Sequence, residues 1–279
     1  RVGDKDMKYR MIAVDLDGTL LDPNGTLNAR TVRAARAAME RGAKIVLSSG
    51  RMPAALKHIG DEIGVNAPAV CFNGGAVVNL QTGETLYQTP VPMDLARDIA
   101  CAAEERGMYL HAFVHGGYIA PEYNDKTAAY ERLSGVKATV VNRPVSEAMD
   151  EAPMKLLIID TPEGAEAALP GLQAQFAGRA TIMRSQKHLI ECVDVNTGKA
   201  GALSFLAKHL GLTAEEAISF GDGQNDLDML LWSGESYVMD NAQEALKKAS
   251  PRFKIAPSNA KQGVAQVIER LIAEDRIGV

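Results

Sequence analysis

Two aspartates, Asp15 and Asp17, follow an apolar run that begins at Met11 and is typical of a buried strand. Continuous apolar strands belong to parallel sheets covered on both faces, and ligands in such folds collect beyond the carboxyl ends of the strands. Because side chains alternate along an extended segment, the two carboxylates can face one small site. Two like charges about 4 Å apart repel by roughly 4 kcal/mol at an effective dielectric near 20. The pair therefore needs a shared proton or a cation, and a hard divalent metal would meet that need.

Three further stretches place polar side chains after an apolar strand or at the start of a helix. These side chains belong to Ser49, Lys199, Asp222, Asn225 and Asp226. Strand ends of a parallel sheet gather at one edge, so we expect these groups to converge with the first acid pair. A hydroxyl, an ammonium and several carboxylates around one point are the groups that phosphoryl transfer needs. Asp226 can alternatively cap the helix that follows it.

The elements that must position these groups alternate between strand and helix at both ends of the chain. The first part predicts strands at 11–14, 43–48 and 69–72 and helices at 28–41 and 53–63. The last part predicts helices at 198–210, 227–232, 242–249 and 263–273 and strands at 217–220 and 236–239. This alternation is typical of a parallel sheet with right-handed crossovers. The predicted fold class is α/β, with a Rossmann-like doubly wound parallel sheet as the core.

The middle of the chain does not continue the alternation of strand and helix, because a hairpin is predicted over 76–88 around Gln81-Thr82-Gly83. Helices and strands then follow in mixed order, with helices at 93–106, 127–133 and 162–176 and strands at 109–114, 118–120, 155–159, 180–184 and 189–193. This mixture predicts an inserted α+β domain with its own core. We therefore expect a discontinuous core formed by residues 1–83 and 192–279, and an inserted cap formed by residues 84–191.

The motifs taken together resemble one enzyme family. They are D-x-D-G-T-L from Asp15, Ser-Gly-Arg from Ser49, a lysine at a helix start, and G-D-x-x-N-D from Gly221. This combination resembles the haloacid dehalogenase superfamily, and in particular its Cof-type phosphatases, in which a C2-type cap is inserted between the second and third motifs. The resemblance covers both ends of the chain and the position of the insertion. Within the cap it is architectural.

The resemblance implies an enzyme that uses Mg²⁺ to hydrolyse phosphate monoesters of small metabolites, such as sugar phosphates, through an aspartyl-phosphate. It implies Asp15 as nucleophile and Asp17 as the general acid that later becomes the general base. Ser49 would donate a hydrogen bond to a phosphoryl oxygen, and Lys199 would neutralise the transferring group. The cap would exclude bulk water and select the substrate.

The resemblance also implies a metal site and a set of neighbours around the phosphate. The implied metal-binding residues are Asp15, Asp17 (through its main-chain carbonyl), Asp222 and Asp226. The expected substrate-binding residues are Gly18, Thr19, Gly50, Arg51, Asn73 and Asn225. One departure from the family pattern is Asp240 before Asn241-Ala242, where glycine is frequent; an extra carboxylate there could narrow the substrate range or point to solvent.

Two other functions remain open on the sequence. A phosphomutase of the same superfamily would also keep both Asp15 and Asp17, and a ligand-sensing protein could keep the fold with little turnover. Other sites are excluded by their residues: the segment 15–26 lacks the glycine and glutamate of an EF-hand, and no Walker A motif is present. His111 and His115 are spaced as a helical metal pair, but their segment is predicted to be extended, so we expect them to line the cap or lie on its surface.

The charge and composition of the chain limit the classes of partner that we expect for the protein. The net charge is −5 over 279 residues, with no lysine or arginine cluster, so nucleic acid and anionic membranes are not expected partners. Three widely spaced cysteines predict free thiols in a reducing compartment, and no apolar stretch approaches the length needed to span a bilayer. We therefore expect a cytoplasmic protein whose partner is a small phosphorylated metabolite; the sequence does not predict its oligomeric state.

Overall fold

The computed structural model describes residues 8–114 and 116–279, and the chain divides into two compact units. The first unit contains the described residues up to Gly50 together with Leu56–Leu86 and Gly198–Val279. The second contains Arg51–Ala55 and Tyr87–Thr197. His115 lies outside the described residues. Among those that are described, no helix is both long and apolar enough to cross a membrane.

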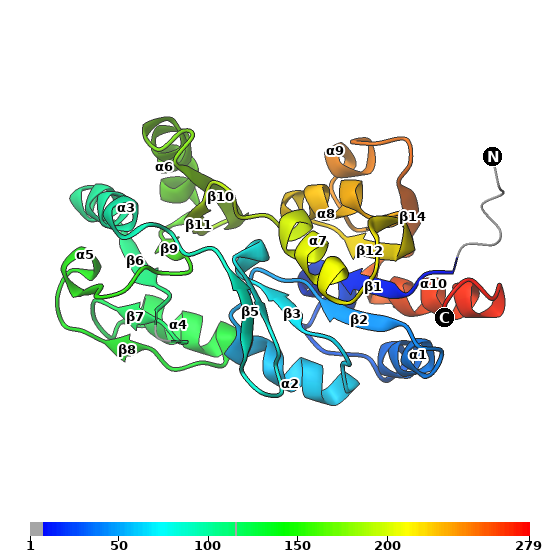
Figure 1. Ribbon diagram of the computed structural model, residues 1–279. Helices are drawn as coiled ribbons and strands as arrows, with labels where there is room; N and C mark the ends of the chain where they lie inside the picture. The colour runs from blue at the N-terminus through cyan, green and yellow to red at the C-terminus, as the bar shows by residue number, and fades with distance from the viewer. Residues whose placement is uncertain (1–7, 115) are drawn as a thin grey trace. The chain divides into compact units, whose positions relative to one another are not determined.

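A five-stranded parallel sheet forms the centre of the first unit (Figure 1). Its strand order is β14 (Lys254–Ala256), β13 (Glu235–Met239), β12 (Ala217–Gly221), β1 (Met11–Val14) and β2 (Lys44–Leu47). All four neighbouring pairs are parallel. β1 lies in the middle and is completely buried, which explains its unbroken apolar sequence. The predicted doubly wound sheet is confirmed.

Helices cover both faces of this sheet, as Figure 1 shows. α1 (Ala29–Glu40) packs with α10 (Gly263–Ala273), and α7 (Lys199–His209) packs with α8 (Leu227–Trp232). The remaining helices of the unit are α2 (Pro53–Ile63), most of which belongs to it, and the short α9 (Glu244–Lys247). α1 starts where predicted, because the Asn28 side chain accepts a hydrogen bond from Arg30 N at 2.9 Å.

A small antiparallel sheet completes the first unit. It contains β3 (Ala69–Cys71), β4 (Ala76–Val78) and β5 (Thr85–Gln88), the last extending into the second unit by sequence. The predicted hairpin over 76–88 is confirmed. β3 joins the parallel sheet through a single parallel bridge between Ser48 and Val70, so most of its hydrogen bonds go to β4 instead.

The second unit is a six-stranded sheet with helices. The strand order is β10 (Ala180–Gln186), β11 (Leu189–Asp194), β9 (Leu156–Ile159), β6 (Tyr109–Ala112), β7 (Ile119–Ala120) and β8 (Thr139–Val140). All neighbours are antiparallel except β7 and β8. The helices are α3 (Met93–Glu105), α4 (Asp125–Ser134), α5 (Val145–Ala148) and α6 (Pro162–Gln175).

The two faces of this sheet carry different side chains. One face belongs to the apolar core that the sheet forms with α3, α5 and α6, and it carries Leu110 and Ala112 of β6 and Leu156 of β9. His111, between Leu110 and Ala112 in sequence, points to the other face because side chains alternate. It is fully buried, and its ring lies about 5 Å from the ring of Tyr118. The expectation that His111 lines the cap or lies on its surface was therefore wrong, while its extended segment is confirmed.

Four elements differ from the sequence prediction. β14 was not predicted, because two of its three residues, Lys254 and Ile255, are exposed and leave no apolar pattern. β8 and α5 are too short to show a periodic pattern. The helix expected over 242–249 is limited to Glu244–Lys247, since the chain at Ala242 still forms a turn to the Met239 carbonyl.

Candidate active site

Asp15 stands at the carboxyl end of the central strand. β1 ends at Val14, and Asp15 continues its extended backbone, with Asp15 N donating to the Phe220 carbonyl at 3.0 Å. Asp15 is buried, with 6% of the residue exposed. The chain then makes a wide turn over Leu16–Leu20, closed by a hydrogen bond from Leu21 N to the Leu16 carbonyl. The buried strand thus delivers one carboxylate to a fixed point.

Asp222 reaches the same point from the neighbouring strand. It follows β12, which pairs in parallel with β1. Its carboxylate accepts a hydrogen bond from Thr19 Oγ1 at 2.7 Å. Gly18 has a φ of +84°, and a Cβ at this position would overlap the Asp222 carboxylate. Glycine is therefore required at position 18 by both the backbone conformation and the close approach of Asp222.

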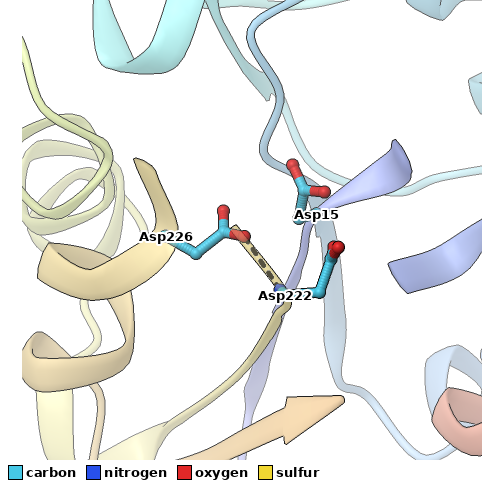
Figure 2. A group of neighbouring side chains, drawn as sticks. All are labelled: Asp15, Asp222 and Asp226. Carbon is cyan, nitrogen blue, oxygen red and sulfur yellow. Dashed lines mark hydrogen bonds between the residues drawn. The ribbon is translucent and has the colours of Figure 1, made fainter. Parts of the chain in front are cut away.

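Asp226 completes a group of three carboxylates. It ends a short turn over Gln224–Asp226, and its Oδ2 accepts hydrogen bonds from Asp222 N at 3.0 Å and Gly223 N at 2.9 Å. Figure 2 shows the bond from Asp222 N, with the three carboxylates clustered around one point. One oxygen from each of Asp15, Asp222 and Asp226 lies within 4.8 Å of the others. The expected convergence of remote acids is therefore present.

Lys199 is the cation of this group. Its ammonium donates to Asp15 Oδ1 and to Asp226 Oδ1, each at 2.6 Å, and to the Ser48 carbonyl at 2.9 Å. The residue is fully buried at the first position of α7. A Cβ on Gly74 would overlap the carbonyl of Gly198, so a glycine lets the start of α7 approach closely enough for Lys199 to reach both acids.

Burial and mutual repulsion set the protonation of the acids. Two ionised carboxylates no more than 4.8 Å apart repel by at least about 3 kcal/mol at an effective dielectric near 20. Burial raises the pKa of Asp15 well above its usual range, and the Asp226 charge raises it further, while Lys199 opposes both. Burial also raises the pKa of Asp222 to about 6, against the hydrogen bond from Thr19. For Lys199, burial alone would lower the pKa, but Asp15 and Asp226 outweigh it and raise it.

The donor set fits a hard divalent cation. Three carboxylates and one ammonium leave a formal charge of −2 in a largely buried site. Oxygen ligands from carboxylates are those that Mg²⁺ prefers, and few are needed because it keeps several waters. Burial and the neighbouring carboxylates raise the pKa values of Asp15 and Asp222, and a bound cation would oppose both effects. Asp15, Asp222 and Asp226 are the side chains that would hold such an ion.

The structure also places the other predicted residues. Asn225 Nδ2 donates to Asn73 Oδ1 at 3.0 Å, and Gly50 lies against the Asn73 amide, so these three lie together. Ser49 is buried beside Gly50, with its N–H bonded to the Val70 carbonyl. Asp17 has an exposed side chain, and its charge helps to raise the pKa of Asp222. It is not one of the three clustered carboxylates. Arg51 is half-buried and belongs to the second unit.

Sequence reasoning assigned no role to three side chains that shape the site, although Asn241 was noted beside Asp240. Asp228 Oδ2 accepts a hydrogen bond from Ala200 N at 3.0 Å and so caps the start of α7. Asn241 Nδ2 donates to the Gly18 carbonyl at 2.8 Å, and Asn259 Nδ2 donates to the Leu21 carbonyl at 2.9 Å. Asp228 could have been found by its position two residues after Asp226, but the contacts of the asparagines have no local sequence pattern.

Asp240, the residue at which the sequence departs from the family pattern, lies at the surface. Its side chain is exposed and lies 3.6 Å from the Lys247 ammonium. The neighbouring Asn241, rather than Asp240, contacts the turn that follows Asp15.

Comparisons with known proteins agree with this geometry. Residues 12–268 match the family described as haloacid dehalogenase-like hydrolase. The HMP-PP phosphatase of Klebsiella pneumoniae is 25% identical over 259 residues, which cover 93% of this chain and 94% of that protein. A haloacid dehalogenase-like hydrolase from Bacteroides thetaiotaomicron has a crystal structure with a TM-score of 0.84 and 27% identity, covering 95% of this chain and all of that one. A crystal structure from Thermotoga maritima gives a TM-score of 0.81 at 29% identity, covering 94% and 97%.

Proposed function

The chain belongs to the haloacid dehalogenase-like hydrolase family and is an enzyme of its phosphatase type, and from this premise we propose that it hydrolyses phosphate monoesters of small metabolites with Mg²⁺. The observation that supports this most is the position of Asp15. Its buried carboxylate is held by Lys199 and lies in one group with Asp222 and Asp226 at the ends of two parallel strands. That arrangement combines a nucleophile with positive charge and a divalent cation site.

The proposed reaction has two steps. In the first, an oxygen of Asp15 attacks phosphorus, the bond from phosphorus to the ester oxygen breaks, and Asp17 gives its proton to the leaving alkoxide. In the second, Asp17 takes a proton from water, the resulting nucleophile attacks the aspartyl-phosphate, and inorganic phosphate and the free Asp15 carboxylate are released. The exposed side chain of Asp17 suits this role, because an acid that serves a substrate and then water must be reachable by both.

The other residues would bind the transferring group. The Lys199 ammonium balances the charge that accumulates on Asp15 and the phosphoryl oxygens, and Ser49 would donate a hydrogen bond to one of those oxygens. A magnesium ion held by Asp15, Asp222 and Asp226, and by the Asp17 carbonyl, would supply further neutralising charge. We further propose that Gly18, Thr19, Gly50, Arg51, Asn73 and Asn225 line the phosphate site.

The inserted second unit is proposed to select the ester, and small phosphorylated metabolites such as sugar phosphates are the proposed substrates. A relative with full-length similarity is named for its action on HMP-PP, which is itself a small phosphorylated compound by name. The free cysteines Cys71 and Cys192, both buried, suit the reducing cytoplasm that the sequence predicts.

Phosphate release from a panel of small esters, with Mg²⁺ and with EDTA, tests the proposal. Asp15→Asn should reduce turnover by several orders of magnitude, because an amide is a poor nucleophile, while circular dichroism stays that of the wild type. Asp61→Asn, at an exposed aspartate bonded to Lys57, is the matched control and should keep full activity. Activity of Asp15→Asn within tenfold of the wild type would refute Asp15 as nucleophile. An isomerised ester in place of inorganic phosphate would identify a mutase, and no turnover of any ester would favour a sensor.

A further inference from the structure

Two asparagines from different loops hold the turn that contains Asp17. Asn241, in the loop after β13, donates its amide N–H to the Gly18 carbonyl at 2.8 Å. Asn259, in the short turn after β14, donates to the Leu21 carbonyl at 2.9 Å. The two are joined, because Asn259 N donates to Asn241 Oδ1 at 3.0 Å. The turn is thus bonded to loops more than 200 residues later in the chain.

These bonds restrict the backbone around Asp17, the proposed general acid, whose side chain must point at the leaving oxygen. The backbone before Asp17 is fixed where Asp15 N bonds to Phe220, and the backbone after it is fixed where the Gly18 carbonyl bonds to Asn241. Asp17 itself has non-helical angles, φ −78° and ψ 115°, inside the turn, and its side chain is exposed. The turn therefore sets the backbone from which the Asp17 side chain leaves, and a change in the turn would change the direction of that side chain.

The two sides of the turn have different partners. Thr19 Oγ1 bonds to Asp222 and ties the turn to the carboxylate group. Asn241 bonds to Gly18 from another loop, and its own side chain is exposed. Removal of the Asn241 amide leaves the Gly18 carbonyl accessible to water, so the loss should affect the direction of the turn more than the stability of the fold.

Resting on the proposed function, we propose that Asn241 is a positioning residue that directs Asp17 at the leaving oxygen of the substrate through its hydrogen bond to the Gly18 carbonyl. Asn259 supports it by fixing the Asn241 side chain and the end of the same turn. Asn241 does not touch the reacting atoms in this proposal. Its effect is limited to the step in which Asp17 transfers a proton.

Because only proton transfer by Asp17 should be affected, two esters that differ in their need for that proton should respond differently, which a general structural defect would not produce. An alkyl phosphate releases a strongly basic alkoxide, which needs the proton from Asp17, whereas 2,4-dinitrophenyl phosphate releases a phenolate that is stable without one. The ratio kcat/KM reports the steps up to phosphoryl transfer from the free enzyme and substrate. A misdirected Asp17 should therefore slow the alkyl ester and spare the aryl ester.

The experiment compares the wild-type protein with three variants, using one alkyl phosphate that the wild type hydrolyses and 2,4-dinitrophenyl phosphate. Asn241→Ala removes both bonds of the side chain. Asn241→Asp keeps an oxygen for Asn259 N but cannot donate to Gly18. Gln243→Ala, at an exposed residue of the same loop whose side chain makes no capping bond, is the matched control. Thermal unfolding of each metal-free protein is measured alongside.

We expect both Asn241 variants to lose about tenfold or more in kcat/KM on the alkyl ester and less than about threefold on the aryl ester. The unfolding temperature of Asn241→Asp should stay within about 2 °C of the wild type, since one exposed hydrogen bond is lost. Asn241→Ala also loses the bond from Asn259 N and should stay within about 4 °C. Equal losses on the two esters, with a raised KM, would overturn the proposal in favour of a substrate contact, and unchanged kinetics on both would overturn it outright. A wild-type enzyme that releases no phosphate from either ester would instead refute the proposed function and this inference with it.

Discussion

Asp222→Asn should make the metal-free protein more stable at pH 8 while removing its response to Mg²⁺. The structure supplies the reason, because Asp222 is one of three clustered carboxylates and the Lys199 ammonium pairs with the other two. Its pKa is raised from 3.8 to about 6, first by burial. A pKa shift of that size corresponds to about 3 kcal/mol of unfavourable ionisation in the folded state. The asparagine keeps an oxygen that can accept the Thr19 hydrogen bond and carries no charge.

The sign of the pH dependence follows from the raised pKa. The folded state holds the Asp222 proton more tightly than the unfolded chain, so the stability contributed by this group is complete below pH 3.8 and lost as the pH rises through about 6. In EDTA at pH 8, Asp222→Asn should therefore exceed the wild type by about 2 to 3 kcal/mol in free energy of unfolding. The difference should shrink through the window from pH 6 to pH 4 and vanish below it.

Urea unfolding followed by circular dichroism at several pH values measures this difference, with and without Mg²⁺. Mg²⁺ should raise the wild-type midpoint, because a ligand that binds only the folded state stabilises it, and should leave the variant unchanged. Asp240→Asn, at an exposed carboxylate near Lys247, is the control and should follow the wild type in both respects. A variant less stable than the wild type at pH 8 in EDTA, or a difference that does not change with pH, would refute the reasoning.

Two other substitutions each test a buried titratable residue, Lys199 in the first unit and His111 in the second. Lys199→Met should lower the free energy of unfolding by about 3 to 5 kcal/mol in EDTA at pH 8, because it leaves Asp15 and Asp226 without their ion-pair partner. It should also lower kcat by about 10²- to 10³-fold. Urea unfolding and phosphate release measure the two effects, and a stable, active variant would contradict the ion-pair assignment. His111→Phe should remove a pH dependence of stability: burial lowers the pKa of His111 from 6.5 to about 3, so the wild type loses stability as the pH falls from about 6.5 toward 3. The variant should therefore gain about 2 kcal/mol over the wild type between pH 7 and pH 5 in urea unfolding, and parallel pH curves would disprove the assignment.

Much of the core could be predicted because its signals are local. The strands before Asp15 and Asp222 are buried on both faces; the first is an unbroken apolar run, and the second is apolar apart from Ser219. The start of α1 was visible in Asn28, whose side chain caps it. In contrast, β14 has an exposed Lys254 and Ile255, and no apolar pattern predicts an edge strand of three residues.

The site was predictable only in part for the same reason. Burial of Lys199 between two acids follows from the folding of three separate segments, and its own helix would place it equally well on the surface. The bond from Asn241 to Gly18 joins residues 223 positions apart and leaves no trace in either local sequence. His111 was misplaced because alternation shows that it faces away from Leu110, but not that Tyr118 and Tyr130 cover it there.

The parallel sheet has a consequence for how the protein folds during synthesis. β1 is made first, yet its neighbour β12 begins only at Ala217, after the whole second unit has been translated. The second unit can therefore acquire its structure on the ribosome, since its sheet and core come from one continuous segment apart from Arg51–Ala55. β1 must wait with an apolar edge uncovered, and nascent chains that stall before Ala217 should be held by chaperones and lack the acidic centre altogether.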